Sequence, residues 1–226
     1  MCLFVDWQAR EPDEHNKGRG YLWKFFISLV IGLAQIAFGF SAHSIAVVGD
    51  ALHTLFHVFG DMLSVVAEYV VKLFGLKNQK ERRVRAIFGL LSALLLIVIS
   101  VFIFIEGVRR WYNPVEIAGY LMFIGGSIGF VGNIVNMFVI HSGVGKIHQH
   151  WSIMSLFKED EDETHIWSHR DIFFDCADSL AVCIGAVIFL VTGINRIDSI
   201  LSFIISFFIF FSTVYTLYTS TFKNLK

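Results

Sequence analysis

Cysteine and charged residues are both scarce in this chain of 226 residues. The three cysteines, Cys2, Cys176 and Cys183, form no paired disulfide framework, and the last two are interpreted as small packing residues within an apolar segment. Charged residues make up only 16% of the chain, and hydrophobic residues make up 55%. A soluble protein of this length needs one buried core, so the excess of apolar sequence indicates that lipid is part of the solvent.

Several other signals are absent. Residues 1–20 are too polar for a cleaved signal peptide, so the first apolar segment is expected to remain as a membrane anchor. Neither a solenoid repeat nor a low-complexity tract occurs. The only acidic run, at residues 159–163, is typical of a solvated loop.

Six apolar segments are long enough to span a bilayer, since a spanning helix needs about 20 mostly apolar residues. We expect these helices at Leu22 to Phe40, Ser44 to Phe74, Val84 to Ile105, Ile117 to Ile140, Asp171 to Val191 and Ile197 to Tyr218. Asn113 and Pro114 mark the turn between the third and fourth helices, because the residue before proline avoids the helical region.

Basic residues predict the orientation. Lysine and arginine gather in the N-terminal segment, in the connections at 77–85 and 142–170, and at the end of the chain. With six spans, all of these lie on one side, and Arg109, Arg110 and Arg196 lie on the other. The positive-inside rule therefore predicts that both termini are cytoplasmic.

The predicted fold is an all-α integral membrane protein with six transmembrane helices. Residues 1–20 form a cytoplasmic N-terminal segment, residues 21–222 form the transmembrane domain with a His-rich and acidic cytoplasmic loop at 142–169, and residues 223–226 form a short tail.

Charged and metal-ligating side chains recur at helical spacing inside two of these spans, where they are costly and tend to be functional. His53 and His57 share one helical face, and Asp171 and Asp175 share another. Two imidazoles and two carboxylates suit a tetrahedral zinc site. Each residue alone has a plainer interpretation, as a hydrogen-bonded core histidine or, for Asp171, as a helix cap.

The segment SIAVVGDALHTLFH resembles the second-helix signature of the cation diffusion facilitator family, whose vertebrate members are zinc transporters. That signature reads roughly S-x-A-x-x-x-D-A-x-H-x-x-x-D, and it matches Ser44, Ala46, Asp50, Ala51 and His53. The segment DIFFDCADSLAV resembles the fifth-helix signature through Asp175 and Ser179, and EGVRRWYNPVEI and IDSILSFIISFF resemble the segments around the third and sixth helices. The resemblance covers about residues 20–222.

The chain departs from the family pattern at two points. His57 stands where the family commonly has aspartate, and Asp171 stands where it commonly has histidine, so the total ligand set is unchanged but metal selectivity is open. The chain also ends about eight residues after the sixth span, where most family members continue into a cytoplasmic dimerising domain.

The resemblance implies a divalent metal efflux transporter, most simply for zinc, that works by alternating access with protons as the counter-ion. We expect no enzymatic activity: His53-x-x-x-His57 resembles the first histidine box of membrane di-iron enzymes, but the further H-x-x-H-H boxes are missing from the sequence. Two alternatives stay open: a transport-inactive subunit that partners an active relative, and a transporter for manganese, cobalt, iron or cadmium. Partners would be the metal ion, protons, the bilayer and a weak homodimer or heterodimer, in a plasma or organelle membrane.

Residues near the site have alternative interpretations. Asp50 is either a group at the outer opening or a hydrated charge at a helix end, and Asp61 with His57 would make a slipped ligand pair. Gln35, Asn133 and Asn136 are interpreted as interhelical hydrogen-bonding groups. The Gly125-x-x-x-Gly129 motif is interpreted as an intramolecular packing surface, with packing in a dimer as the alternative. His148, His150, His165 and His169 would either concentrate metal at the mouth of the pathway or simply belong to a polar loop.

Overall fold

The structure is a computed structural model that describes the backbone of residues 12–143 and 163–223, and the side chains of residues 23–139, 173–215 and 217. Within these residues it consists of six helices: α1 (Pro12–Ala42), α2 (Ile45–Leu73), α3 (Gln79–Tyr112), α4 (Gly119–Gly143), α5 (Glu163–Thr192) and α6 (Arg196–Lys223). Each contains an apolar stretch long enough to cross a membrane. The predicted all-α, six-span architecture is confirmed, and the chain is a multi-pass integral membrane protein.

The helices extend further than the hydrophobic segments predicted. α1 begins at Pro12, in the first turn where proline is tolerated, and α3 covers Gln79–Tyr112. α5 begins at Glu163, so the backbone at His165 and His169 is helical and the prediction of a loop through residue 169 was wrong. Hydropathy marks only the part of a helix that lies in lipid, whereas the ladder of backbone hydrogen bonds continues into polar turns. His148 and His150 lie outside the described residues.

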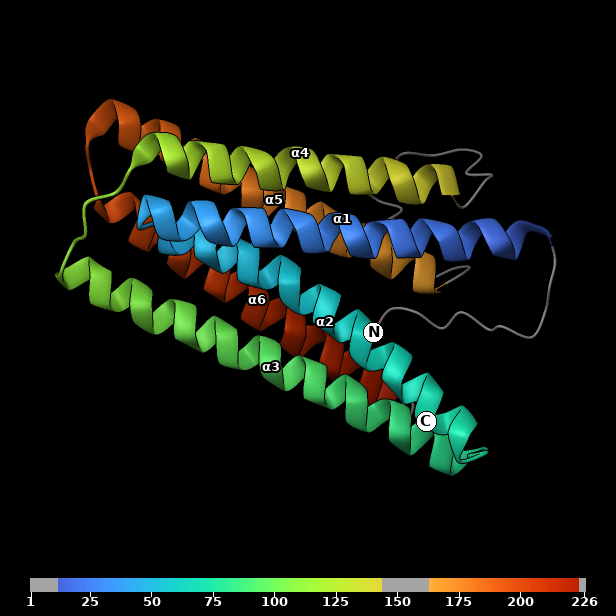
Figure 1. Ribbon diagram of the computed structural model, residues 1–226. Coiled ribbons are helices and arrows are strands. Elements are labelled where there is room, and N and C mark those ends of the chain that lie inside the picture. The colour runs from blue at the N-terminus through green and yellow to red at the C-terminus, as the bar shows by residue number, and fades with distance from the viewer. Residues whose placement is uncertain (1–11, 144–162, 224–226) are drawn as a thin grey trace.

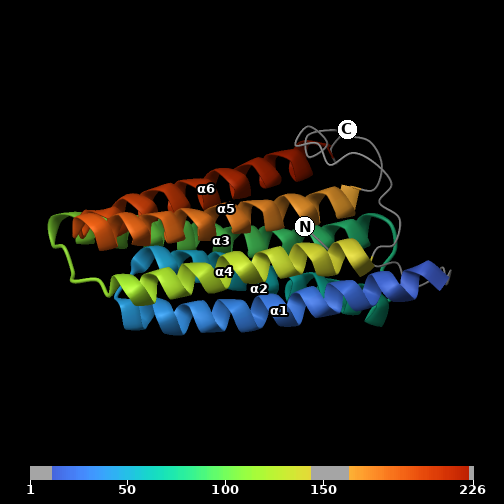
Figure 2. The same ribbon diagram turned by 90° about the horizontal axis from the view of Figure 1, so that it is seen from above.

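The six helices form two groups that share α2. The most extensive packing joins α1 with α4, α4 with α5, α3 with α6, and α2 with both α1 and α3. Figure 1 shows that α2, α3 and α6 lean away from α1, α4 and α5 towards one end of the bundle. Figures 1 and 2 also place the first described turn of α1 and the last turn of α6 at that same end.

The buried apolar core lies towards the opposite end of the bundle. It includes Ala46 and Val47 from the first turn of α2, Ile103 of α3, Met122 of α4 and Ile205 of α6. Large apolar side chains also cover the outside of the bundle, including Val30, Phe40, Ile105, Phe138, Val191 and Phe207. An apolar exterior of this extent is expected of helices that face lipid.

Small residues let α4 approach its neighbours closely. A Cβ atom added to Gly125 would lie 2.9 Å from Val47 Cγ1, and one added to Gly129 would lie 2.6 Å from Ser179 Oγ. Both glycines therefore pack within the molecule, as the Gly-x-x-x-Gly spacing predicted. Asn136 Nδ2 donates to Ser28 Oγ at 2.9 Å, which confirms the interpretation of Asn136 as an interhelical group.

Candidate metal centre

His53 and His57 lie on the face of α2 that meets α5. They are one helical turn apart, and their ring centroids are 4.6 Å apart. His53 is 4% exposed, and the opposing Asp175 on α5 is 7% exposed. A buried imidazole and a buried carboxylate inside membrane spans are costly, so this pair of helix faces is a candidate functional site.

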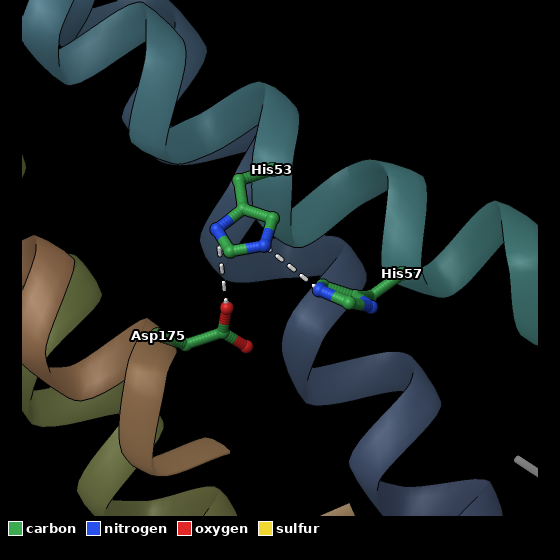
Figure 3. A group of neighbouring side chains, drawn as sticks. All are labelled: His53, His57 and Asp175. Carbon is green, nitrogen blue, oxygen red and sulfur yellow. Dashed lines mark hydrogen bonds and ion pairs between the residues drawn. The ribbon is translucent and has the colours of Figure 1, made fainter. Parts of the chain in front are cut away.

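The ligand atoms of three side chains converge between the two helices, as Figure 3 shows. His53 Nε2 lies 2.9 Å from His57 Nε2, and His53 Nδ1 lies 3.6 Å from Asp175 Oδ1. One ligand atom from each of His53, His57 and Asp175 can be chosen so that all three lie within 4.8 Å of one another. Two nitrogens on one tetrahedral zinc, each bound at about 2.0–2.1 Å, would be about 3.3 Å apart, so the two facing Nε2 atoms need to separate by only a few tenths of an ångström to bind one ion.

Of the four ligands predicted from the sequence, the structure brings together three: His53, His57 and Asp175. The backbone of Asp171 lies one turn before Asp175 on α5, and its side chain lies outside the described residues. Imidazole and carboxylate donors together favour zinc and the later divalent metals over manganese and magnesium.

The slipped pair of His57 with Asp61 is not the arrangement in the structure. Asp61 Oδ2 lies 4.0 Å from Lys24 Nζ on α1, whereas His57 faces His53. The pair of His53 and His57, rather than the pair of His57 and Asp61, therefore clusters with α5.

Asp50, one turn before His53, belongs to a buried polar network between α1, α2 and α5. Its Oδ2 accepts hydrogen bonds from Gln35 Nε2 at 2.6 Å and from Ser179 Oγ at 2.7 Å. The side chain is 0% exposed, so the interpretation of Asp50 as a hydrated helix-end charge was wrong. Gln35 was correctly predicted to bond between helices, but its partner Asp50 was not foreseen.

The site contains a further carboxylate, Asp178, that the sequence analysis did not assign to it. Asp178 lies one turn after Asp175 on α5, is 6% exposed, and places Oδ2 at 3.1 Å from His53 Nδ1. Its spacing of three residues from Asp175 was the available signal, because residues three apart on a helix share a face.

Another buried carboxylate, Asp198 at the start of α6, holds the beginning of α2. Asp198 Oδ1 accepts from Ser44 Oγ at 2.5 Å and from the backbone N–H of Ala46 at 3.1 Å, while Oδ2 accepts from the N–H of Ile45 at 2.9 Å. Arg110 Nη1 of α3 lies 3.6 Å from Asp198 Oδ2. We call Ser44, Arg110 and Asp198 the α2 latch.

Glu106 pairs with both arginines at the end of α3, and the latch accounts for one of them, Arg110. Arg110 Nε lies 3.0 Å from Glu106 Oε1, and Arg109 Nε lies 3.1 Å from Glu106 Oε2. Arg110 additionally donates to the backbone carbonyl of His43. These arginines are therefore paired within the protein.

The fold and the cluster together define a helical membrane protein in which side chains of metal-ligating types converge between two spans. Residues 22–223 match the family described as the cation efflux transmembrane domain. Because this match covers most of the chain, the protein belongs to the cation efflux family.

Several similar proteins are named as zinc transporters. The chain is 27% identical over 203 residues to the zinc transporter ZitB of Pectobacterium atrosepticum, covering 85% of this chain and 57% of that protein. It is 24% identical over 203 residues to ZitB of Escherichia coli, covering 85% of this chain and 58% of ZitB. It is 27% identical over 212 residues to the zinc transporter ttm-1 of Caenorhabditis elegans, covering 89% and 52%. The chain thus spans about half the length of these relatives.

Proposed function

We propose that this protein exports a divalent metal ion, zinc first among the candidates, through a site between α2 and α5. The observation that carries the proposal is the convergence of His53, His57 and Asp175 in the interior of the bundle. The names of the relatives support zinc as the ion carried. Asp171 is the fourth proposed ligand, because it precedes Asp175 by one turn on the same helix.

We propose that the site works by alternating access, with both termini in the cytoplasm. The apolar core packs around the first turn of α2, on one side of the site. Towards the other end, where α1 begins and α6 ends, α2 and α5 diverge in Figure 1. This arrangement supports a state in which metal reaches the site from the cytoplasmic side while the far side is closed by packed apolar side chains. Release then requires the two groups of helices to rock about α2.

Protons are the proposed counter-ion. A metal ion binds deprotonated carboxylates and neutral imidazoles, so its binding expels protons and protonation promotes its release. The site gathers two imidazoles with Asp175 and Asp178 in one buried cluster, which supplies the groups for such an exchange. We also propose that the protein works in a plasma or organelle membrane and forms a weak homodimer or heterodimer.

Metal flux in sealed proteoliposomes tests the proposal. Zinc, cobalt, cadmium, iron and manganese would be compared, with an imposed pH gradient, a clamped voltage and a trapped pH dye. We expect zinc to move fastest, protons to move in the opposite direction, and acid on the release side to accelerate transport. A zinc flux that does not depend on the pH gradient, with no proton flux in the opposite direction, would indicate a facilitated carrier and contradict antiport. The absence of flux for every metal would contradict the transport function itself.

A further inference from the structure

His53 makes contacts through both of its ring nitrogens. Nε2 lies 2.9 Å from His57 Nε2, and Nδ1 faces α5, where Asp178 Oδ2 is 3.1 Å away and Asp175 Oδ1 is 3.6 Å away. Only the shorter of the two carboxylate distances is within hydrogen-bonding range. Asp178, rather than Asp175, is therefore the hydrogen-bond partner of Nδ1.

Asp178 is placed to support the metal cluster from outside it. The three clustered ligand atoms come from His53, His57 and Asp175, and Asp178 lies beside them on the Nδ1 side of the His53 ring. Figure 3 shows His57 next to one ring nitrogen of His53 and Asp175 next to the other, with the second carboxylate oxygen of Asp175 turned towards His57. A metal held by both histidines and that oxygen would thus use Nε2 of His53.

We propose that Asp178 is a positioning residue that fixes His53 for metal binding, an inference that rests on the function proposed above. Its carboxylate accepts a hydrogen bond from Nδ1–H of His53. The proton on Nδ1 leaves the lone pair on Nε2, on the side where His57 lies. Metal-binding histidines commonly donate their second N–H to a carboxylate, which sets the tautomer, orients the ring and raises its basicity as a ligand.

The competing arrangement makes Asp178 a ligand itself, with the metal bound to Nδ1 of His53. It is disfavoured because His57 lies beside Nε2, across the ring from Nδ1. A metal on Nδ1 would leave His57 turned towards a nitrogen that binds no metal. The two arrangements differ in which nitrogen of His53 carries the ion, so they can be separated by spectroscopy.

The test compares Asp178→Asn and Asp178→Leu in the full chain, purified in detergent. Asparagine keeps an oxygen that accepts Nδ1–H, and leucine removes it at similar volume. The matched control is Cys183→Ala, a buried position further along α5 whose Sγ contacts Ser127 Oγ. Three quantities are measured: the zinc dissociation constant against a chelating dye, the visible spectrum of the cobalt-loaded protein, and the ¹⁵N spectrum of labelled histidine with zinc bound.

We expect leucine to weaken zinc binding by about 10–100-fold, the usual cost of losing a supporting partner of a metal ligand. Asparagine should rescue most of this loss and keep the tetrahedral cobalt spectrum, and the Cys183→Ala control should bind zinc normally. In the unchanged protein, Nε2 of His53 should be metal-bound and Nδ1 should carry a proton. That ¹⁵N result decides the matter even if the leucine variant fails to fold.

Three results would overturn the inference. Metal on Nδ1, or loss of the cobalt spectrum in both Asp178 variants, would make Asp178 a ligand. Normal zinc affinity and spectrum in Asp178→Leu would leave it without a role. Failure of the proposed function is recognised separately, because the unchanged protein would then bind zinc no more tightly than His53→Ala.

Discussion

Two of the buried carboxylate centres at helix α2 differ in how many hydrogen-bond donors their oxygens meet. In the α2 latch, both oxygens of Asp198 accept hydrogen bonds, from a hydroxyl and two backbone N–H groups, and Arg110 lies nearby. In the metal cluster, about 14 Å further along α2, His53 faces Asp175, Asp178 and His57. The cluster is therefore rich in hydrogen-bond acceptors, whereas the carboxylate of the latch is surrounded by donors.

The difference teaches how to separate structural from functional charge in a membrane span. A buried carboxylate with its hydrogen bonds complete and a cation beside it is already stabilised, so it can hold helices together without a ligand. A group of imidazoles and carboxylates with few donors among them is stabilised by a cation or by protons from outside. On this comparison we expect the latch to position α2 and the cluster to bind the transported ion, as proposed above.

The largest expected effect is the loss of one ligand from the cluster. His53→Ala or Asp175→Ala should reduce zinc affinity by more than about 100-fold, since even supporting residues of metal sites cost 10–100-fold. The thermal stability of the metal-free protein should fall less than in a latch variant, because His53 makes one hydrogen bond between helices, to Asp178, whereas Asp198 accepts three. Dye competition and melting curves in detergent provide both quantities. Normal zinc affinity in either variant would remove the site.

The latch should behave in the opposite way. Asp198→Ala leaves two backbone N–H groups of α2 without their acceptor, so we expect a loss of about 2–4 kcal/mol in stability. The zinc affinity of the folded Asp198→Ala protein should stay within about tenfold of the unchanged protein. Asp198 lies away from the cluster, and its loss should cost less than the loss of a residue hydrogen-bonded to a metal ligand. A variant that keeps its stability but loses zinc binding would reverse the roles of the two centres.

Gly129→Ala tests the packing behind the cluster. The added methyl group would meet Gln35 and Ser179, the two donors to Asp50, and overpacking of this kind costs about 1–3 kcal/mol. As a comparison, Ala177→Gly removes a methyl group on the exposed face of α5 and should cost about 1 kcal/mol through helix propensity alone. Unchanged melting of Gly129→Ala would show that α1, α4 and α5 are less tightly packed than described.

The smallest expected effect comes from Ser44→Ala. Ser44 is the N-cap of α2, where its Oγ accepts from the N–H of Val47 at 3.2 Å and donates to Asp198. Loss of an N-cap typically costs about 0.5–2 kcal/mol. Zinc affinity should be unchanged. A double variant with Asp198→Ala should lose less than the sum of the two single losses, since the residues share one hydrogen bond.

The sequence predicted the six spans, the pairing of the α2 and α5 faces and three clustered ligands, because each depends on hydropathy or on the helical period. Counted from the outer ends of the two predicted spans, however, His53 and Asp175 differ in depth by about 10 Å. The structure places them together all the same, since the end of α5 at Thr192 projects past the start of α2 in Figure 1. The relative shift of two helices depends on side-chain packing that no periodicity records.

The α2 latch and the hydrogen-bond partners of Asp50 could not be predicted from the sequence for a related reason. Asp198 and Ser44 are 154 residues apart in the chain, and no sequence pattern links the two positions. Asp50 is read as an end-of-helix charge until Gln35 and Ser179 are seen to surround it. Helix faces follow from local spacing, but the choice of hydrogen-bond partners follows from how six helices pack.

Zinc K-edge X-ray absorption on the full chain, loaded with one equivalent of zinc, tests the central claim most directly. We predict a four-coordinate ion with two imidazole nitrogens and two carboxylate oxygens at about 2.0–2.2 Å. The imidazole scattering should fall by half in His57→Ala and should be unchanged in Asp198→Ala. A spectrum with only oxygen neighbours, or one that changes with Asp198 and not with His57, would contradict a metal centre between α2 and α5.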